Sequence, residues 1–206
     1  NAATSLTSDD WKFTIAKATL TKDDFVVSDN SATYDGEAKA VTVAFTEGIT
    51  DAGQITVTYK QNSEVVANPT NAGTYDIYVS VTEGDRYNAL AATKLDKQLT
   101  ITKATLTADN FTYKAPEDLD WDGNEKTATV TFNDQGKLTG CGNVTIKYND
   151  NATAPSAAGD YTVSIDVAEG TNYNAAAALT KNNWKFTIIA PIQVSYIDEN
   201  GESQTV

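Results

Sequence analysis

Apolar residues alternate with polar or small ones through several short stretches of the chain, the pattern of strands with one buried face. Turn-forming residues such as Asp35-Gly36 and Asn68-Pro69-Thr70 separate these stretches. The two helix candidates, residues 88–92 and 174–179, are rich in Ala and too short to form stable helices alone. The pattern therefore predicts an all-β protein. The alternating sets end at Phe45, Tyr59, Val81, Ile101, Phe132, Tyr148, Val167 and Ile188.

The chain repeats itself. KATLTKDDF, which begins at Lys17, returns as KATLTADNF at Lys103. AGTYDIYVSVTEGDRYNA, which begins at Ala72, returns as AGDYTVSIDVAEGTNYNA at Ala158. Self-similarity at a fixed period is the mark of a repeat architecture. We therefore expect two complete modules, at residues 17–102 and 103–189.

The segments outside these modules also carry strand patterns. WKFTI at residues 11–15 recurs at residues 184–188, where it closes the second module. We therefore expect residues 1–16 to be a tail or the closing strand of a preceding module. The segment 190–206 reads as the start of a following surface module, with Asn200-Gly201 as the two-residue turn of its opening hairpin.

Each module has short strands within about 86 residues, which favours an immunoglobulin-like β-sandwich over a barrel. Tyr75 and Tyr161 each follow a small-residue turn and precede an inward apolar residue by two positions. This placement is similar to the tyrosine corner, in which the phenol bonds to upstream backbone. A β-grasp-like module is the alternative, disfavoured by the missing helix. Because no Gly/Ser-rich or Pro-rich linker separates the modules, we expect an elongated array.

Charge and composition exclude several classes of function. The 15 basic and 28 acidic residues leave a net charge of −13, which argues against nucleic-acid binding. No apolar run approaches the roughly 18 residues of a membrane span, so we expect no membrane insertion. Histidine is absent and Cys141 is the single cysteine, which removes His-based triads, His-ligated metals and disulfides. Cys141 aligns with Ala52, which indicates packing of a small side chain rather than a reactive thiol.

Carboxylates are the remaining acid–base groups, and they form no repeated pair. Asp9/Asp10, Asp23/Asp24 and Asp118/Asp120 each lack an acidic pair at the matching place in the other module. We therefore predict no catalytic residues and no enzyme activity. We also predict no cofactor and no metal site. Calcium is the ion that the turns Glu83–Asp85 and 169–171 would suit best, because it takes carboxylate and carbonyl oxygens.

Most aromatic residues recur at matching positions of the two modules, which indicates a shared core. Tyr34 and Trp121 occupy one such position, next to the Asp-Gly turn, where partial exposure would let them stack against a sugar ring. They are the candidate ligand-contact residues.

Taken together, KATLT, Y-D-G at 34–36, P-T-N-A-G-T-Y at 69–75, and L-T-I-T-K-A at 99–104 resemble the MBG/YDG-type tandem repeats of bacterial surface proteins. The second copy departs from this pattern with Trp121 for Tyr and APSAAGDY for PTNAGTY. The resemblance implies an extracellular, non-catalytic module on the bacterial cell surface, and no known ligand.

From this resemblance we expect a structural stalk repeat of an adhesin-like protein, monomeric within a longer multi-module chain. The alternative is a module that binds host or dietary glycans or glycoproteins, including mucin-type sugars. A weaker alternative is an accessory domain of a secreted carbohydrate-active enzyme.

Overall fold

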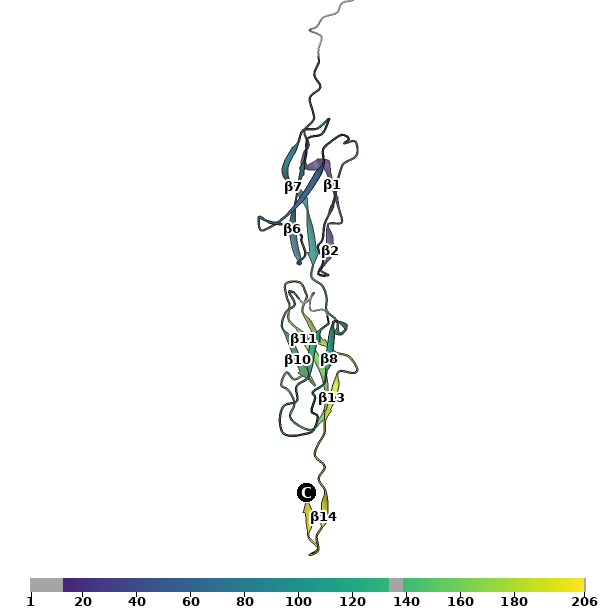
Figure 1. Cartoon of the computed structure of the whole chain (residues 1–206), viewed down its shortest axis with the longest axis vertical. Coiled ribbons are helices and arrows are strands. Elements are labelled where there is room, and N and C mark those ends of the chain that lie inside the picture. Colours follow the sequence, from purple (N-terminus) through teal and green to yellow (C-terminus); the bar gives the residue numbers. More distant parts are fainter. Residues whose placement is uncertain (1–12, 134–138, 206) are drawn as a thin grey trace, which may run out of the picture. The chain divides into compact units, whose positions relative to one another are not determined.

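The computed structural model describes residues 13–133 and 139–205, which form two compact units (Figure 1). The first unit contains the chain up to Ala32 together with Ala38–Ile101, and the second contains Thr33–Glu37 together with Thr102 onward. The all-β prediction is confirmed. The described residues form no α-helix, and their helical turns are two short 3₁₀ segments, Lys22–Asp24 and Ala108–Asn110. None of the described helical segments has the length and apolar character needed to cross a bilayer.

The first unit is built from two antiparallel layers. β1 (Phe25–Ser28) pairs with β3 (Thr42–Phe45). The larger sheet has the order β2-β7-β6-β4-β5, with the bounds β2 Ser31–Thr33, β4 Ile55–Gln61, β5 Glu64–Val66, β6 Gly73–Val81 and β7 Leu90–Thr102. Alternate residues of β6 are at most 3% exposed and form the centre of the core: Tyr75, Ile77, Val79 and Val81.

The second unit repeats this arrangement. β8 (Phe111–Lys114) pairs with β9 (Thr129–Phe132), and β11 (Gly159–Val167) is the central strand of the larger sheet. Its partners are β10 (Val144–Tyr148), β12 (Ala176–Leu179) and β13 (Lys185–Ile188). Val163, Ile165 and Val167 of β11 are buried like their counterparts in β6. The sequence therefore predicted the two-layer, sandwich-like modules correctly.

The Ala-rich stretches, considered above as helix candidates, are parts of strands. Ala176–Leu179 is β12, and β7 begins at Leu90, within the first stretch. Ala178 has φ of 52°, and the pairing of β11 with β12 shifts register nearby. Tertiary pairing with the central strand outweighs the helix propensity of Ala here.

Isolated parallel bridges tie early segments of the repeats to later ones. Isolated parallel bridges join Ala18 to Tyr87, Ala104 to Tyr173 and Asp120 to Ile189, always with 69 positions between the partners. At the start of each repeat an ion pair reinforces this contact: Lys17 binds Glu83, and Lys103 binds Glu169. The segment that opens each repeat is therefore fixed against the loop that follows the central strand, before β7 in the first unit and before β12 in the second.

The tyrosine corner predicted for both modules is present. The Tyr75 hydroxyl donates to the carbonyl of Asn71 at 2.7 Å, and the Tyr161 hydroxyl donates to that of Ala157 at 2.9 Å. A second pair of phenols accepts hydrogen bonds from backbone N–H groups. Tyr59 Oη accepts from the backbone N–H of Val41 at 2.8 Å, and Tyr148 Oη accepts from that of Ala128 at 2.9 Å.

The described parts of the two end segments differ in secondary structure. Residues 1–12, including Trp11, lie outside the described part of the chain, and residues 13–17 form no strand, with Phe13 and Ile15 exposed. β14 (Ser195–Ile197) and β15 (Ser203–Thr205) form the expected hairpin.

The turn of the β14–β15 hairpin differs from the two-residue turn that the sequence predicted. Asp198 N–H donates to Glu202 and Gly201 N–H to Asp198, so the loop has three residues, 199–201, instead of two. Gly201, at φ of 79°, takes the left-handed position that ends such a loop.

Candidate functional site

The two Asp-Gly turns have the same backbone conformation. Asp35 Oδ1 accepts from the N–H of Glu37 at 2.9 Å, and Asp122 Oδ1 accepts from the N–H of Asn124 at 2.9 Å. Gly36 and Gly123 have φ of 87° and 79°, a left-handed region in which any side chain is strained. This local chemistry places Tyr34 and Trp121 equivalently, each directly before its turn.

Tyr34 is buried within the second unit, where it is 5% exposed. Its ring meets the ring of Tyr173 edge to face, with the centroids 5.3 Å apart. Its hydroxyl donates a long hydrogen bond to the carbonyl of Thr139 at 3.4 Å, and its N–H bonds Thr102 at 2.9 Å. The expected partial exposure is therefore wrong for Tyr34, because its ring is buried against Tyr173.

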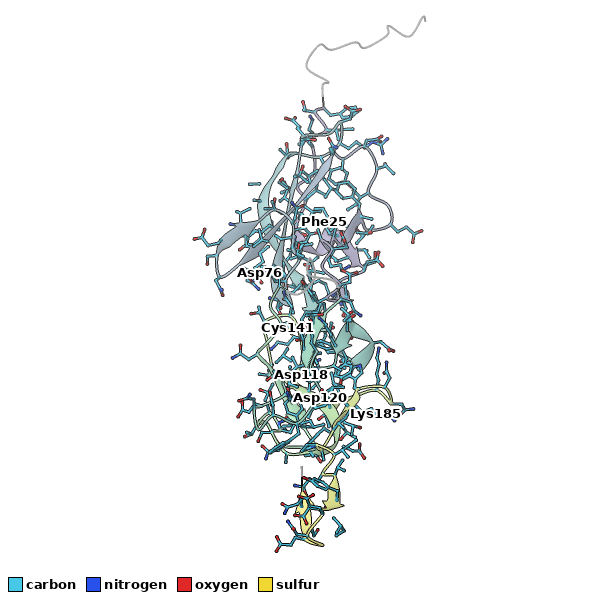
Figure 2. The ribbon with its side chains drawn as sticks, turned by 60° about the horizontal axis from the view of Figure 1, so that its bottom comes forward. Phe25, Asp76, Asp118, Asp120, Cys141 and Lys185 are labelled. Carbon is cyan, nitrogen blue, oxygen red and sulfur yellow. The ribbon has the colours of Figure 1, made fainter. Side chains whose placement is uncertain are left out.

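Trp121 is 46% exposed in the second unit. Its backbone N–H donates to the carbonyl of Ile189 at 2.9 Å, which matches the bond from Tyr34 to Thr102. Figure 2 labels Asp118 and Asp120, which precede it on the same unit. Of the two candidate residues, Trp121 is thus the one whose side chain is accessible to a ligand.

A buried lysine fixes the turn that carries Trp121. Lys126 is 6% exposed, and its Nζ lies 2.9 Å from Asp118 Oδ2 and 3.1 Å from Asp122 Oδ1. The hydrogen bond that Lys126 donates to Asp118 is the main cause that raises the pKa of Lys126, and the same bond lowers the pKa of Asp118. Hydrogen bonds from the side chain and N–H of Asn124, together with Lys126, lower the pKa of Asp122 to about 2.

Sequence reasoning did not identify Lys126. The signal was present, because Lys39 and Lys126 each lie four residues after the Asp of their turn. Their backbone N–H groups make matching bonds, to Pro69 at 2.7 Å and to Pro155 at 2.8 Å. The repeated unit is therefore an aromatic-Asp-Gly turn followed by a lysine, and in the second unit the lysine ties Asp118 to the turn.

The carboxylate pairs serve local structure. Asp9/Asp10 lies outside the described residues. Asp24 accepts from the N–H of Thr21 at 2.6 Å and caps the first 3₁₀ segment, and Asp118 binds Lys126. Within residues 13–133 and 139–205 these carboxylates thus stabilise turns.

The glutamates of the calcium candidate turns are paired with lysines. Hydrogen bonds from Lys17 and Lys103 lower the pKa of Glu83 and Glu169, respectively. In the described part of the chain, no three His, Cys, Asp or Glu side chains are grouped to hold a metal ion. The absence of a metal site stays a prediction, and a calcium ion at these turns would compete with an ammonium group.

Cys141 is a free, half-buried thiol, and burial raises its pKa. A raised pKa lowers the thiolate fraction at neutral pH, and the thiolate is the reactive form. The neighbouring Gly142 is closely packed, since a Cβ there would lie 2.1 Å from the carbonyl oxygen of Ala168. The surroundings fit the packing role predicted for a position that holds Ala in the other repeat.

Comparison with known families identifies both repeats. The model of the MBG domain matches residues 24–105 and again residues 115–182, which together make up more than half of the chain. Comparisons with curated proteins and with solved structures gave no match. The positions matched include both Asp-Gly turns and both tyrosine corners. The chain therefore belongs to the MBG domain family, of which it carries two tandem copies.

Proposed function

We propose that this chain is a structural spacer from a bacterial cell-surface, adhesin-like protein, and that it acts outside the cell without catalysis. The MBG match supports the coarser statement that it is a repeat module of a surface protein. A spacer needs modules that keep their shape and join directly. The net charge of −13 on this chain keeps its modules soluble and makes neighbouring copies repel each other.

The observation that carries the proposal is that the contacts shared by both repeats hold the fold. They comprise the phenol bonds of Tyr75 and Tyr161, those of Tyr59 and Tyr148, and the ion pairs of Lys17 and Lys103. A shared binding site would instead repeat an exposed cluster of polar or aromatic side chains. At the one repeated position considered for ligand contact, Tyr34 is buried while Trp121 is exposed.

A distance measurement between the units tests the spacer role. Spin labels are placed at Glu64→Cys and Asn182→Cys, two exposed positions on different units, in a Cys141→Ser background. A spacer requires one narrow distribution of label-to-label distances by pulsed electron spin resonance. A broad distribution that follows that of a flexible linker would reject the spacer role. Each singly labelled protein serves as the control for aggregation.

Glycan binding is the second candidate, and the exposure of Trp121 is the observation that favours it. An exposed indole beside acidic groups is suited to stacking against a sugar ring and bonding its hydroxyls. The test is binding of the full chain to arrayed mucin-type and plant glycans. Saturable binding that is lost in Trp121→Ala and kept in Tyr196→Ala would establish glycan binding through Trp121. Tyr196 is the matched control, because it is 51% exposed and lies on the β14 hairpin.

A further inference from the structure

The second unit shows how an MBG module accepts an aromatic ring. Tyr34 lies edge to face on Tyr173 and points its hydroxyl at the carbonyl of Thr139. Asn172 is 1% exposed and donates its side-chain N–H to the same carbonyl at 3.0 Å. The ring of Phe132 supports Tyr173 from another side, with centroids 6.1 Å apart. These groups form a receptor that is occupied by the aromatic residue of an aromatic-Asp-Gly turn.

The first unit has the same backbone framework at the matching place. Ala18 N–H bonds Arg86 at 2.9 Å as Ala104 N–H bonds Asn172 at 2.9 Å. Arg86 N–H bonds Asp51 at 3.3 Å as Asn172 N–H bonds Gly140 at 3.0 Å. These pairs of bonds align Tyr87 with Tyr173, and Thr50 with Thr139.

At this place the first unit has an open pocket of about 480 Å³. Tyr87, Thr50 and Arg86 line it together with Ile15, Ala16 and Ala18. Tyr87 is half-buried and Ile15 is 84% exposed, so the groups that would contact an inserted ring are accessible. We call this set of residues the Tyr87 pocket.

We propose that the Tyr87 pocket binds the Trp121-Asp122-Gly123 turn of a second copy of this chain. Trp121 has what the occupied receptor requires, namely a flat ring with a hydrogen-bond donor at its far edge. The indole N–H would donate to the carbonyl of Thr50 as the Tyr34 hydroxyl donates to that of Thr139. The Lys126 ion pairs already hold the turn in the conformation seen around Tyr34.

This contact joins different surfaces of the two copies, so it is heterologous and adds copies head to tail. One ring and its turn cover a small area, which places the interaction in the weak, transient class. The net charge of −13 on each copy also opposes approach at low ionic strength. Added salt screens this repulsion over a Debye length of about 8 Å or less, so association strengthens with salt.

Sedimentation velocity of the full chain, from about 10 µM to about 1 mM and in about 0.15 and 0.5 M NaCl, tests the proposal. We expect the weight-average mass to rise above 22.0 kDa with concentration and with salt. Trp121→Ala should weaken association at least about tenfold, while Trp121→Tyr, which keeps ring and donor, should retain it. Tyr196→Ala, which removes a comparably exposed ring elsewhere, should have no effect.

A mixing experiment separates this interface from general stickiness. Ala16→Trp places a ring over the pocket at an exposed position outside any strand, so we expect it to block binding without unfolding the unit. Circular dichroism checks the fold of each variant. Trp121→Ala and Ala16→Trp should each be monomeric alone and should form a 1:1 complex when mixed, because one keeps the pocket and the other keeps the turn.

Three results would overturn the proposal. The first is a wild-type chain that stays monomeric at the highest concentration and salt. The second is self-association that survives Trp121→Ala, which would assign the contact to another surface. A mixture of the two variants that remains monomeric while the wild type associates would also contradict the pairing of this turn with this pocket.

Discussion

Removing one phenol oxygen from each module should destabilise the two units to different extents. Tyr148→Phe and Tyr59→Phe keep the ring and delete only the acceptor for a backbone N–H. In the second unit that N–H belongs to Ala128, which is 1% exposed, at 2.9 Å from the phenol. In the first unit it belongs to Val41, which is only half-buried, at 2.8 Å.

The magnitudes follow from what replaces the lost bond. A buried donor left without a partner costs about 1–3 kcal/mol, because the group stays desolvated. We therefore expect Tyr148→Phe to lower the free energy of unfolding of the second unit by about 2 kcal/mol. Water can reach the Val41 N–H, so Tyr59→Phe should cost the first unit about 0.5–1 kcal/mol. For a module of this size about 1 kcal/mol moves the melting temperature by about 4–8 °C.

Native-state hydrogen exchange measures the two units separately. The amides of Val79 and Ile165 lie in the fully buried central strands, so their exchange reports unfolding of the first and second unit. Tyr148→Phe should speed exchange at Ile165 and leave Val79 unchanged, and Tyr59→Phe should do the opposite to a smaller extent. Equal losses in both units, or a larger loss for Tyr59→Phe, would refute the reasoning from burial.

Three further predictions can be checked by chemical or thermal unfolding. Tyr34→Ala should destabilise the second unit by about 1.5–3 kcal/mol, since its ring is buried there, whereas Trp121→Ala should change it little; equal effects would contradict the assignment of Tyr34. The pKa of Asp122 is lowered to about 2 in the folded state, so its stabilising contribution is full above the unfolded value near 3.9 and is lost as the pH falls toward about 2. Asp122→Asn should therefore make the free energy of unfolding of the second unit depend less on pH in that range. Gly142→Ala should prevent the second unit from folding, because the new Cβ would lie 2.1 Å from a carbonyl oxygen, while Gly123→Ala, with open space but φ of 79°, should cost about 1–2 kcal/mol; comparable circular dichroism of the two variants would contradict this.

The strands and the tyrosine corners could be predicted because their causes are local. Alternation along β6 and β11 follows from one buried face, and Tyr75 bonds a carbonyl four residues upstream. The three-residue loop at Gly201 was missed because Asn-Gly alone does not fix the register of the strands that it joins.

The candidate site was harder to predict because its residues depend on distant partners. Tyr34 and Trp121 both precede an Asp-Gly turn, yet Tyr34 is buried against Tyr173, 139 positions along the chain, and Trp121 is exposed. Lys126 was not identified from the sequence, because lysine is rarely buried. Its burial depends on two aspartates that the turn brings to it.

The parallel leading segment has a mechanical consequence for a module pulled by its two ends. In the second unit Ala104 is bonded beside Tyr173 and Asp120 beside Ile189, both in parallel register. Tension that draws Ala104 backward and Ile189 forward acts along the segments that each bridge joins. The two backbone bonds of each bridge, and the Lys103–Glu169 ion pair beside the first, are then loaded in shear. Because the two bonds of one bridge must break together, each bridge resists extension better than a hairpin that unzips one bond at a time.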